Sequence, residues 1–160
     1  MESTKAIRTR AFSKIDSIFL LIIVASIVAV MLTRSNQSKA PHPEVFAQNV
    51  SLEEATAQSA ETGKPVLVFA TASWCPPCQS FKRGALSDPK VAEAINEQAI
   101  PVYLDIDEHP EQASMFGVRS VPTLILTDGR DITKATGVMN SAKTIDWLNQ
   151  SVTKLATSAD

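Results

Sequence analysis

The sequence has few cysteines and histidines, the residues that cross-link small domains or bind metals. Its 160 residues include only 2 cysteines, 2 histidines and 5 glycines. Two cysteines three positions apart exclude a miniature domain held together by several disulfides. There is no internal repeat and no low-complexity tract, and an apolar fraction of 44% excludes a disordered chain. The length fits one small globular domain with an additional segment.

The sequence also lacks an excess of basic residues in its main body. Residues 1–40 contain six basic and two acidic residues, whereas residues 41–160 contain nine basic and fifteen acidic ones. A protein that binds nucleic acid through its phosphates needs a basic face. The acidic main body therefore argues against nucleic acid as a partner.

Charge is absent altogether between Ser17 and Thr33, where seventeen uncharged and mostly apolar residues follow one another. A core helix of a soluble domain would show a polar face, and this run has none. Four basic residues precede the run, at positions 5, 8, 10 and 14. The positive-inside rule then predicts a cytoplasmic N-terminus at 1–16, a single transmembrane anchor at 17–33, and delivery of the rest across the membrane.

A cleaved signal peptide is the alternative to an anchor, because seventeen residues is short for a span. Small residues fit a cleavage site at Ser38–Ala40, but Pro41 follows it, and a second candidate at Val45–Ala47 lies far from the apolar run. The anchor is therefore favoured over a secreted soluble form, and a buried core helix is the least favoured reading. The polar stretch 34–49, which contains two prolines and a solvated His42, is expected to be a linker to a domain at 50–160.

Helical and strand patterns alternate along residues 50–160, which predicts an α/β domain with a parallel core sheet and an antiparallel hairpin at its edge. The expected helices are 51–63, 79–83, 89–97, 110–116 and 140–155, and the expected strands are 65–71, 100–106, 124–127 and 131–136.

The chemistry is expected at Cys75 and Cys78, which follow a buried strand and open a helix. A thiolate at a helix N-terminus is stabilised by unpaired N–H groups and the helix dipole. The second cysteine, one turn further on, lies within reach to resolve a mixed disulfide, so the pair can exchange two electrons with a client. We expect Cys75 to be the exposed attacking sulfur and Cys78 the shielded resolving one.

Three other readings of the cysteine pair are weaker. A structural disulfide would close a very small loop and stabilise little. Zinc needs four ligands, and only His42 and His109 could join the pair. Copper capture by the two thiolates, as in a copper-delivery module, is the main rival function, although no methionine or histidine ligand stands near the pair. We therefore expect no metal and no other cofactor.

Two motifs resemble the thioredoxin superfamily: Trp74-Cys75-Pro76-Pro77-Cys78 and Ser120-Val121-Pro122-Thr123. The resemblance covers roughly residues 50–156 and is nearest to membrane-tethered, periplasm-facing thioredoxin-like proteins. It implies a thioredoxin fold, with a central mixed sheet and helices on both faces, preceded here by one N-terminal transmembrane helix. It also implies a single-pass protein of a bacterial inner membrane with a periplasmic catalytic domain, or one that faces a thylakoid lumen.

The resemblance also implies roles for individual residues. Cys75 and Cys78 would form the redox-active disulfide, and Pro76 and Pro77 would make up the active-site loop. Trp74 would be an aromatic wall for the substrate. Pro122 would be cis and would leave the Val121 backbone open to pair with a client peptide.

The sequence departs from the family behind the active-site helix and in the loop between the cysteines. Phe69 and Tyr103 stand where many thioredoxins have a buried acid and its lysine partner, so the proton of Cys78 must reach water, a client group or Asp105. The two loop prolines remove N–H donors near the Cys75 sulfur, which favours a reductant or isomerase over an oxidant.

The expected clients are protein dithiols or disulfides. The expected electron source is a membrane-embedded thiol transporter, and the domain is expected to be monomeric.

Overall fold

The computed structural model describes residues 14–35, 40–47 and 49–158, and it divides into two units, Met1–Ser38 and Lys39–Asp160. The first unit contains helix α1 (Lys14–Ser35), which includes the apolar run predicted at 17–33. The large apolar side chains of α1 between Ile18 and Met31 are exposed. Among the described residues, no helix meets the combined length and hydropathy that crossing a membrane requires. Most of the predicted cytoplasmic segment 1–16 and two residues of the first candidate cleavage site lie outside the described residues.

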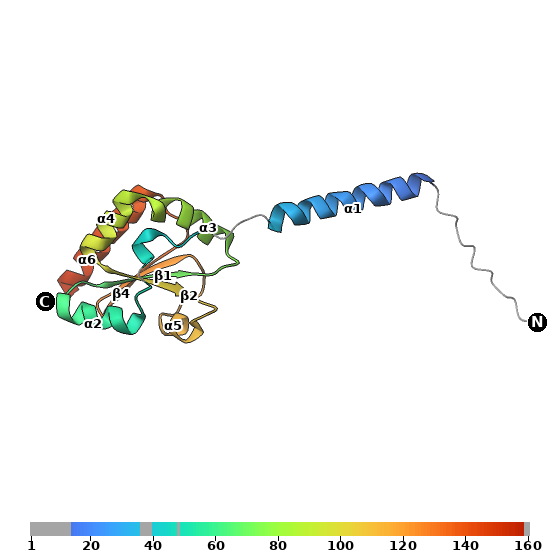
Figure 1. Cartoon of the computed structure of the whole chain (residues 1–160). Coiled ribbons are helices and arrows are strands. Elements are labelled where there is room, and N and C mark those ends of the chain that lie inside the picture. The colour runs from blue at the N-terminus through green and yellow to red at the C-terminus, as the bar shows by residue number, and fades with distance from the viewer. Residues whose placement is uncertain (1–13, 36–39, 48, 159–160) are drawn as a thin grey trace, which may run out of the picture. The chain divides into compact units, whose positions relative to one another are not determined.

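The second unit is built on a four-stranded mixed sheet with the order β2-β1-β3-β4 (Figure 1). Strand β1 (Val66–Thr71) pairs in parallel with β2 (Ile100–Asp105) and antiparallel with β3 (Thr123–Thr127), which in turn pairs antiparallel with β4 (Ile132–Thr136). The expected parallel core is therefore limited to one pair of strands. The hairpin lies beside β1 instead of forming only an edge, since β3 occupies an interior position.

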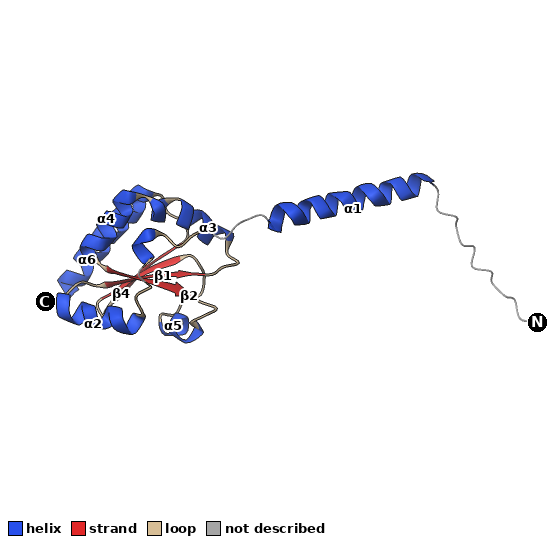
Figure 2. Ribbon diagram, viewed as in Figure 1, coloured by secondary structure: helices blue, strands red, loops and turns tan. Residues whose placement is uncertain are grey.

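Helices cover both faces of the sheet, as predicted (Figure 2). One face carries α3 (Pro76–Arg83), α4 (Pro89–Gln98) and α6 (Ser141–Ser158), while the other carries α2 (Leu52–Thr62) and α5 (Pro110–Met115). Side chains alternate along a strand, so neighbouring residues of β1 enter different cores. Leu67 and Phe69 join the core under α3, α4 and α6, whereas Val66, Val68 and Ala70 join the other.

Local sequence signals set the helix ends. The hydroxyl of Ser51 accepts a hydrogen bond from the N–H of Glu54 at the start of α2, and Gly63 closes that helix with a φ of 72°. Asp88 caps α4 through the N–H of Lys90, with Pro89 at the first helical position. A short 3-10 turn, η2 (Ala85–Ser87), separates α3 from α4.

The segment Ala40–Ala47, which we call the strap, packs on the domain instead of serving as a free linker. It contains the 3-10 turn η1 (Glu44–Phe46), and Val45 and Phe46 are 5% and 2% exposed within the core. The part of 34–49 that could act as a linker is therefore shorter than predicted, and the packed domain extends about ten residues before position 50. His42 is exposed at the surface, but its ring also stacks on Tyr103 at a centroid distance of 4.1 Å.

Candidate active site

The cysteine pair lies where the end of β1 leads into α3. Cys75 is the N-cap residue of α3, and a disulfide of 2.13 Å joins its sulfur to that of Cys78. The backbone N–H of Cys78 donates to Cys75 Sγ at 3.2 Å, and the N–H of Gln79 donates to the Cys75 carbonyl at 3.1 Å. Pro76 and Pro77 form the exposed first turn of the helix. The sequence therefore placed the pair correctly at the junction of strand and helix.

Both cysteines are buried in this oxidised structure. Cys75 is 3% exposed and Cys78 is 0% exposed. They pack with Ala72, and the partly buried side chains of Ile106 and Val121 lie against this small cluster. The expectation of an openly exposed Cys75 is wrong for the disulfide form, because these apolar groups cover the pair. Cys75 is nevertheless the more exposed of the two residues.

A cis peptide bond between Val121 and Pro122 faces the cysteine pair, as the resemblance implied. The carbonyl oxygen of Val121 lies 3.6 Å from Cys75 Sγ. Pro122 is buried, and its carbonyl accepts a hydrogen bond of 2.8 Å from the N–H of Gly137. The loop before β3 is thereby held next to Cys75, with the Val121 backbone at the sulfur.

Trp74 stands at the surface beside the pair and is not part of the core. Its side chain is 65% exposed, and its indole N–H donates to the Asp107 carboxylate at 2.7 Å. The bond joins the active-site loop to the loop that follows β2. An exposed indole held in one orientation offers an apolar surface beside the disulfide.

Phe69 and Tyr103, the two departures noted above, lie opposite each other on β1 and β2. Their ring centroids are 5.9 Å apart, and Phe69 also contacts Phe46 and Phe81. Burial, together with the negative charge of Asp105, raises the pKa of Tyr103 to about 12. The apolar ring of Phe69 and the neutral hydroxyl of Tyr103 therefore lie behind the active-site helix.

Two functional candidates on α3 escaped the sequence analysis, Gln79 and Lys82. Gln79 accepts a hydrogen bond of 2.8 Å from the N–H of Ala40 in the strap and donates to the carbonyls of Ala72 and Ser73. Lys82 is only 4% exposed, and its amine donates to the Tyr103 hydroxyl. The available signals were that Gln79 directly follows Cys78 and that Lys82 lies four residues, about one helical turn, after it. Neither residue type is usually buried, so these signals were weak.

A polar hollow of about 260 Å³ opens beside this part of the helix. It is lined by side chains of the strap, the active-site loop, α3, β2 and the loop after β2: Ala40, His42, Ser73, Gln79, Lys82, Tyr103, Asp105, Asp107 and Glu108. Among the described residues, no group of three or more histidine, cysteine or acidic side chains could hold a metal ion.

Comparisons with known proteins agree with this geometry. A family model described as thioredoxin-like matches residues 47–129. A thioredoxin of Alicyclobacillus acidocaldarius is 42% identical over 81 residues, which cover 50% of this chain and 74% of that protein. A thioredoxin of Rickettsia typhi is 30% identical over 93 residues, covering 58% and 86%. The solution structure of a thioredoxin from Thermus thermophilus shares the fold, with a TM-score of 0.57 at 22% identity, covering 68% of this chain and 89% of that one.

The chain belongs to the thioredoxin-like family. Its disulfide at the start of α3 and its thioredoxin relatives make it a thiol–disulfide oxidoreductase. Proteins of this type act on the thiols and disulfides of other proteins, through the exchange of electrons between two cysteine pairs.

Proposed function

We propose that this protein reduces or isomerises disulfides of client proteins outside the cytoplasm, with Cys75 as the attacking thiolate and Cys78 as the resolving thiol. The Cys75 thiolate attacks a client disulfide and forms a mixed disulfide, releasing one client sulfur. The Cys78 thiolate then attacks Cys75 Sγ, which releases the second client sulfur and forms the Cys75–Cys78 bond. The client gains two electrons and the protein is oxidised.

The observation that carries this proposal is the position of the cysteine pair against the cis-proline loop. Cys75 caps α3 and lies 3.6 Å from the Val121 carbonyl, while Cys78 is fully buried behind it. An extended client chain that pairs with the Val121 backbone would bring its cysteine to Cys75. Exposed Trp74 lies beside the pair and would contact the same client.

The preference for reduction rests on the two loop prolines. Pro76 and Pro77 have no backbone N–H to donate. Within the described residues, the backbone hydrogen bond to Cys75 Sγ comes from the N–H of Cys78. Fewer donors stabilise the Cys75 thiolate less. A less stable thiolate makes the disulfide harder to reduce, which suits a reductant or isomerase.

A measured reduction potential tests this direction. A value near about −270 mV would resemble that of thioredoxin, and one near about −120 mV would match a strong oxidant and contradict the proposal. Cys78→Ala should trap a client as a stable mixed disulfide on Cys75, and Cys75→Ala should trap none. If Cys75→Ala traps clients equally well, the assignment of the attacking sulfur is wrong.

We also propose that residues 17–33 anchor the protein in a bacterial inner membrane, with the N-terminus in the cytoplasm and the catalytic domain in the periplasm. Support comes from the seventeen uncharged residues, the four basic residues before them, and the exposure of the apolar side chains of α1. A reductant in that place needs electrons, which a membrane-embedded thiol transporter would supply.

Protease treatment of cells with a permeabilised outer membrane tests the anchor and its orientation. The domain should be digested while a short N-terminal fragment stays with the membrane after an alkaline wash. Leu20→Arg combined with Val24→Arg should release the protein from the membrane, whereas Ser17→Arg with Thr33→Arg, at the ends of the run, should not. Recovery of a shortened soluble domain from unmodified cells would instead indicate a cleaved signal peptide.

A further inference from the structure

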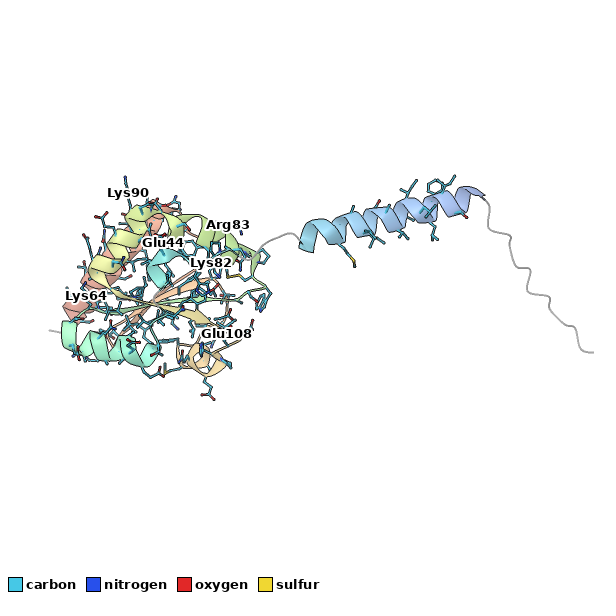
Figure 3. All side chains as sticks on the ribbon, viewed as in Figure 1. Glu44, Lys64, Lys82, Arg83, Lys90 and Glu108 are labelled. Atoms are coloured by element: carbon cyan, nitrogen blue, oxygen red, sulfur yellow. A yellow bond between two sulfur atoms is a disulfide. The ribbon has the colours of Figure 1, made fainter. Side chains whose placement is uncertain are left out.

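Helix α3 presents a buried amine on the same face as the resolving cysteine. Cys78 and Lys82 are 0% and 4% exposed, and both face the sheet. Residues four apart on a helix lie one above the other, with Cβ atoms about 5–6 Å apart. The next residue, Arg83, is exposed instead. Figure 3 labels both side chains. The chain thus places one of two adjacent cations on the protein side of α3 and the other on the solvent side.

The sheet holds the Lys82 amine in place. Its nitrogen donates to the Tyr103 hydroxyl and lies 4.9 Å from the centre of the Tyr103 ring. Tyr103 is in turn fixed between Phe69 on β1 and the His42 ring of the strap. A long lysine side chain is normally mobile and solvated, so this packing restricts it to one position at the base of the active-site helix.

Lys82 lines the polar hollow together with other titratable groups. The titratable groups that line the hollow with it are His42 from the strap, Tyr103 and Asp105 from β2, and Asp107 and Glu108 from the next loop. Three of these five are carboxylates, and negative charges favour an ammonium over a neutral amine.

We propose that Lys82 is a positioning residue for the resolving step, its ammonium stabilising the Cys78 thiolate while Tyr103 holds the amine in place. This inference rests on the proposed function, in which Cys78 resolves the mixed disulfide. The Cys78 thiol gives its proton to water. The resulting thiolate attacks Cys75 Sγ, the bond between Cys75 and the client sulfur breaks, and the client sulfur leaves with the electron pair and takes up a proton from water.

The test uses the reduced full-length protein and an aromatic disulfide whose thiolate absorbs visible light. Attack by Cys75 releases the first coloured thiolate, and attack by Cys78 releases the second, so one trace separates the two steps. In the Lys82→Met variant we expect the second release to slow about tenfold at about pH 7 and its pH midpoint to rise by about one unit. The first release should change much less.

Two matched variants separate charge from packing. Lys82→Arg keeps a cation and should restore most of the rate of the second release, whereas Arg83→Met removes the adjacent exposed cation and should leave that rate unchanged. An unchanged pH midpoint in Lys82→Met, or an equal shift in Arg83→Met, would overturn the proposal.

The unmodified protein provides a measurement that does not depend on the folding of a variant. Its second release should have a pH midpoint below the ordinary thiol value of about 8.5. A midpoint at or above that value would overturn the role of Lys82 even if neither variant folds. If only one coloured thiolate is ever released, Cys78 does not resolve the disulfide, and the proposed function itself fails.

Discussion

The two faces of the sheet are packed with different kinds of side chain. Under α3, α4 and α6, the rings of Phe46, Phe69, Phe81 and Tyr103 contact one another at centroid distances of 5.6 to 6.4 Å. Under α2 and α5 the core is aliphatic, and Phe116 is the one aromatic in its buried cluster among the described residues. The aromatic face also carries Lys82 and Gln79 next to the cysteine pair. One face therefore combines aromatic packing with buried polar groups on the active-site helix, while the core of the other face is almost entirely aliphatic.

Replacing neighbouring residues of β1 should show the largest difference between the faces. Phe69→Ala should lower the free energy of unfolding by about 3–5 kcal/mol, since it removes a ring that three others contact. Val68→Ala should cost about 2 kcal/mol, from two carbon atoms at about 0.8 kcal/mol each and a small cavity. Denaturant unfolding measures both losses. Equal losses would mean that packing on the aromatic face contributes no more to stability than packing on the aliphatic face.

Gln79→Ala should have an intermediate effect, confined to the aromatic face. Loss of the side-chain oxygen leaves the buried N–H of Ala40 without its partner, which costs about 1–3 kcal/mol. The strap should then loosen, and hydrogen exchange at residues 40–47 should become faster. Ser80→Ala, on the exposed side of the same helix, is the matched control and should change neither quantity. Unchanged exchange in Gln79→Ala would mean that Val45 and Phe46 alone hold the strap.

Tyr103→Phe should have the smallest effect at neutral pH, about 1 kcal/mol, because it removes one hydrogen bond and keeps the ring. The difference should appear in alkali. The folded pKa of about 12 lies above that of a free phenol, about 10, so the unfolded chain releases its proton first. Stability from this group is complete below about pH 10 and is lost as the pH rises towards 12.

The chain has 1 tyrosine, so the ultraviolet absorbance of tyrosinate reports Tyr103 directly. Between about pH 10 and 12, Tyr103→Phe should lose less stability than the unmodified protein. A tyrosinate midpoint near the free value would show that the aromatic face does not exclude water from the hydroxyl.

Much of the fold was predictable from local patterns. The strand expected at 65–71 is β1 at Val66–Thr71, and the helix expected at 140–155 is α6 at Ser141–Ser158. Ser51 and Gly63 marked the ends of α2 because caps depend on nearby residues. The position of β3 beside β1 was not predictable, because strand order depends on contacts between segments far apart in the chain.

The strap shows the same limit. Pro41, His42 and Pro43 make it look like a linker, and it offers only two large apolar residues, Val45 and Phe46. Such a short segment has no periodicity to detect. It is buried only because α4 and β2 provide a surface that fits it, and Gln79 supplies a partner for its backbone.

The sequence by itself determined the cysteine pair and its place between a strand and a helix, because both depend on a short motif of nearby residues. The cis proline was implied only by the resemblance to a known family. Tertiary structure alone decided that the disulfide form of Cys75 is covered, that Trp74 bonds to Asp107, and that Lys82 is buried while Arg83 is not. The identity of a charged residue in a sequence does not show what surrounds its side chain in the fold. Its environment is set by residues that are distant in the chain, and packing brings them together.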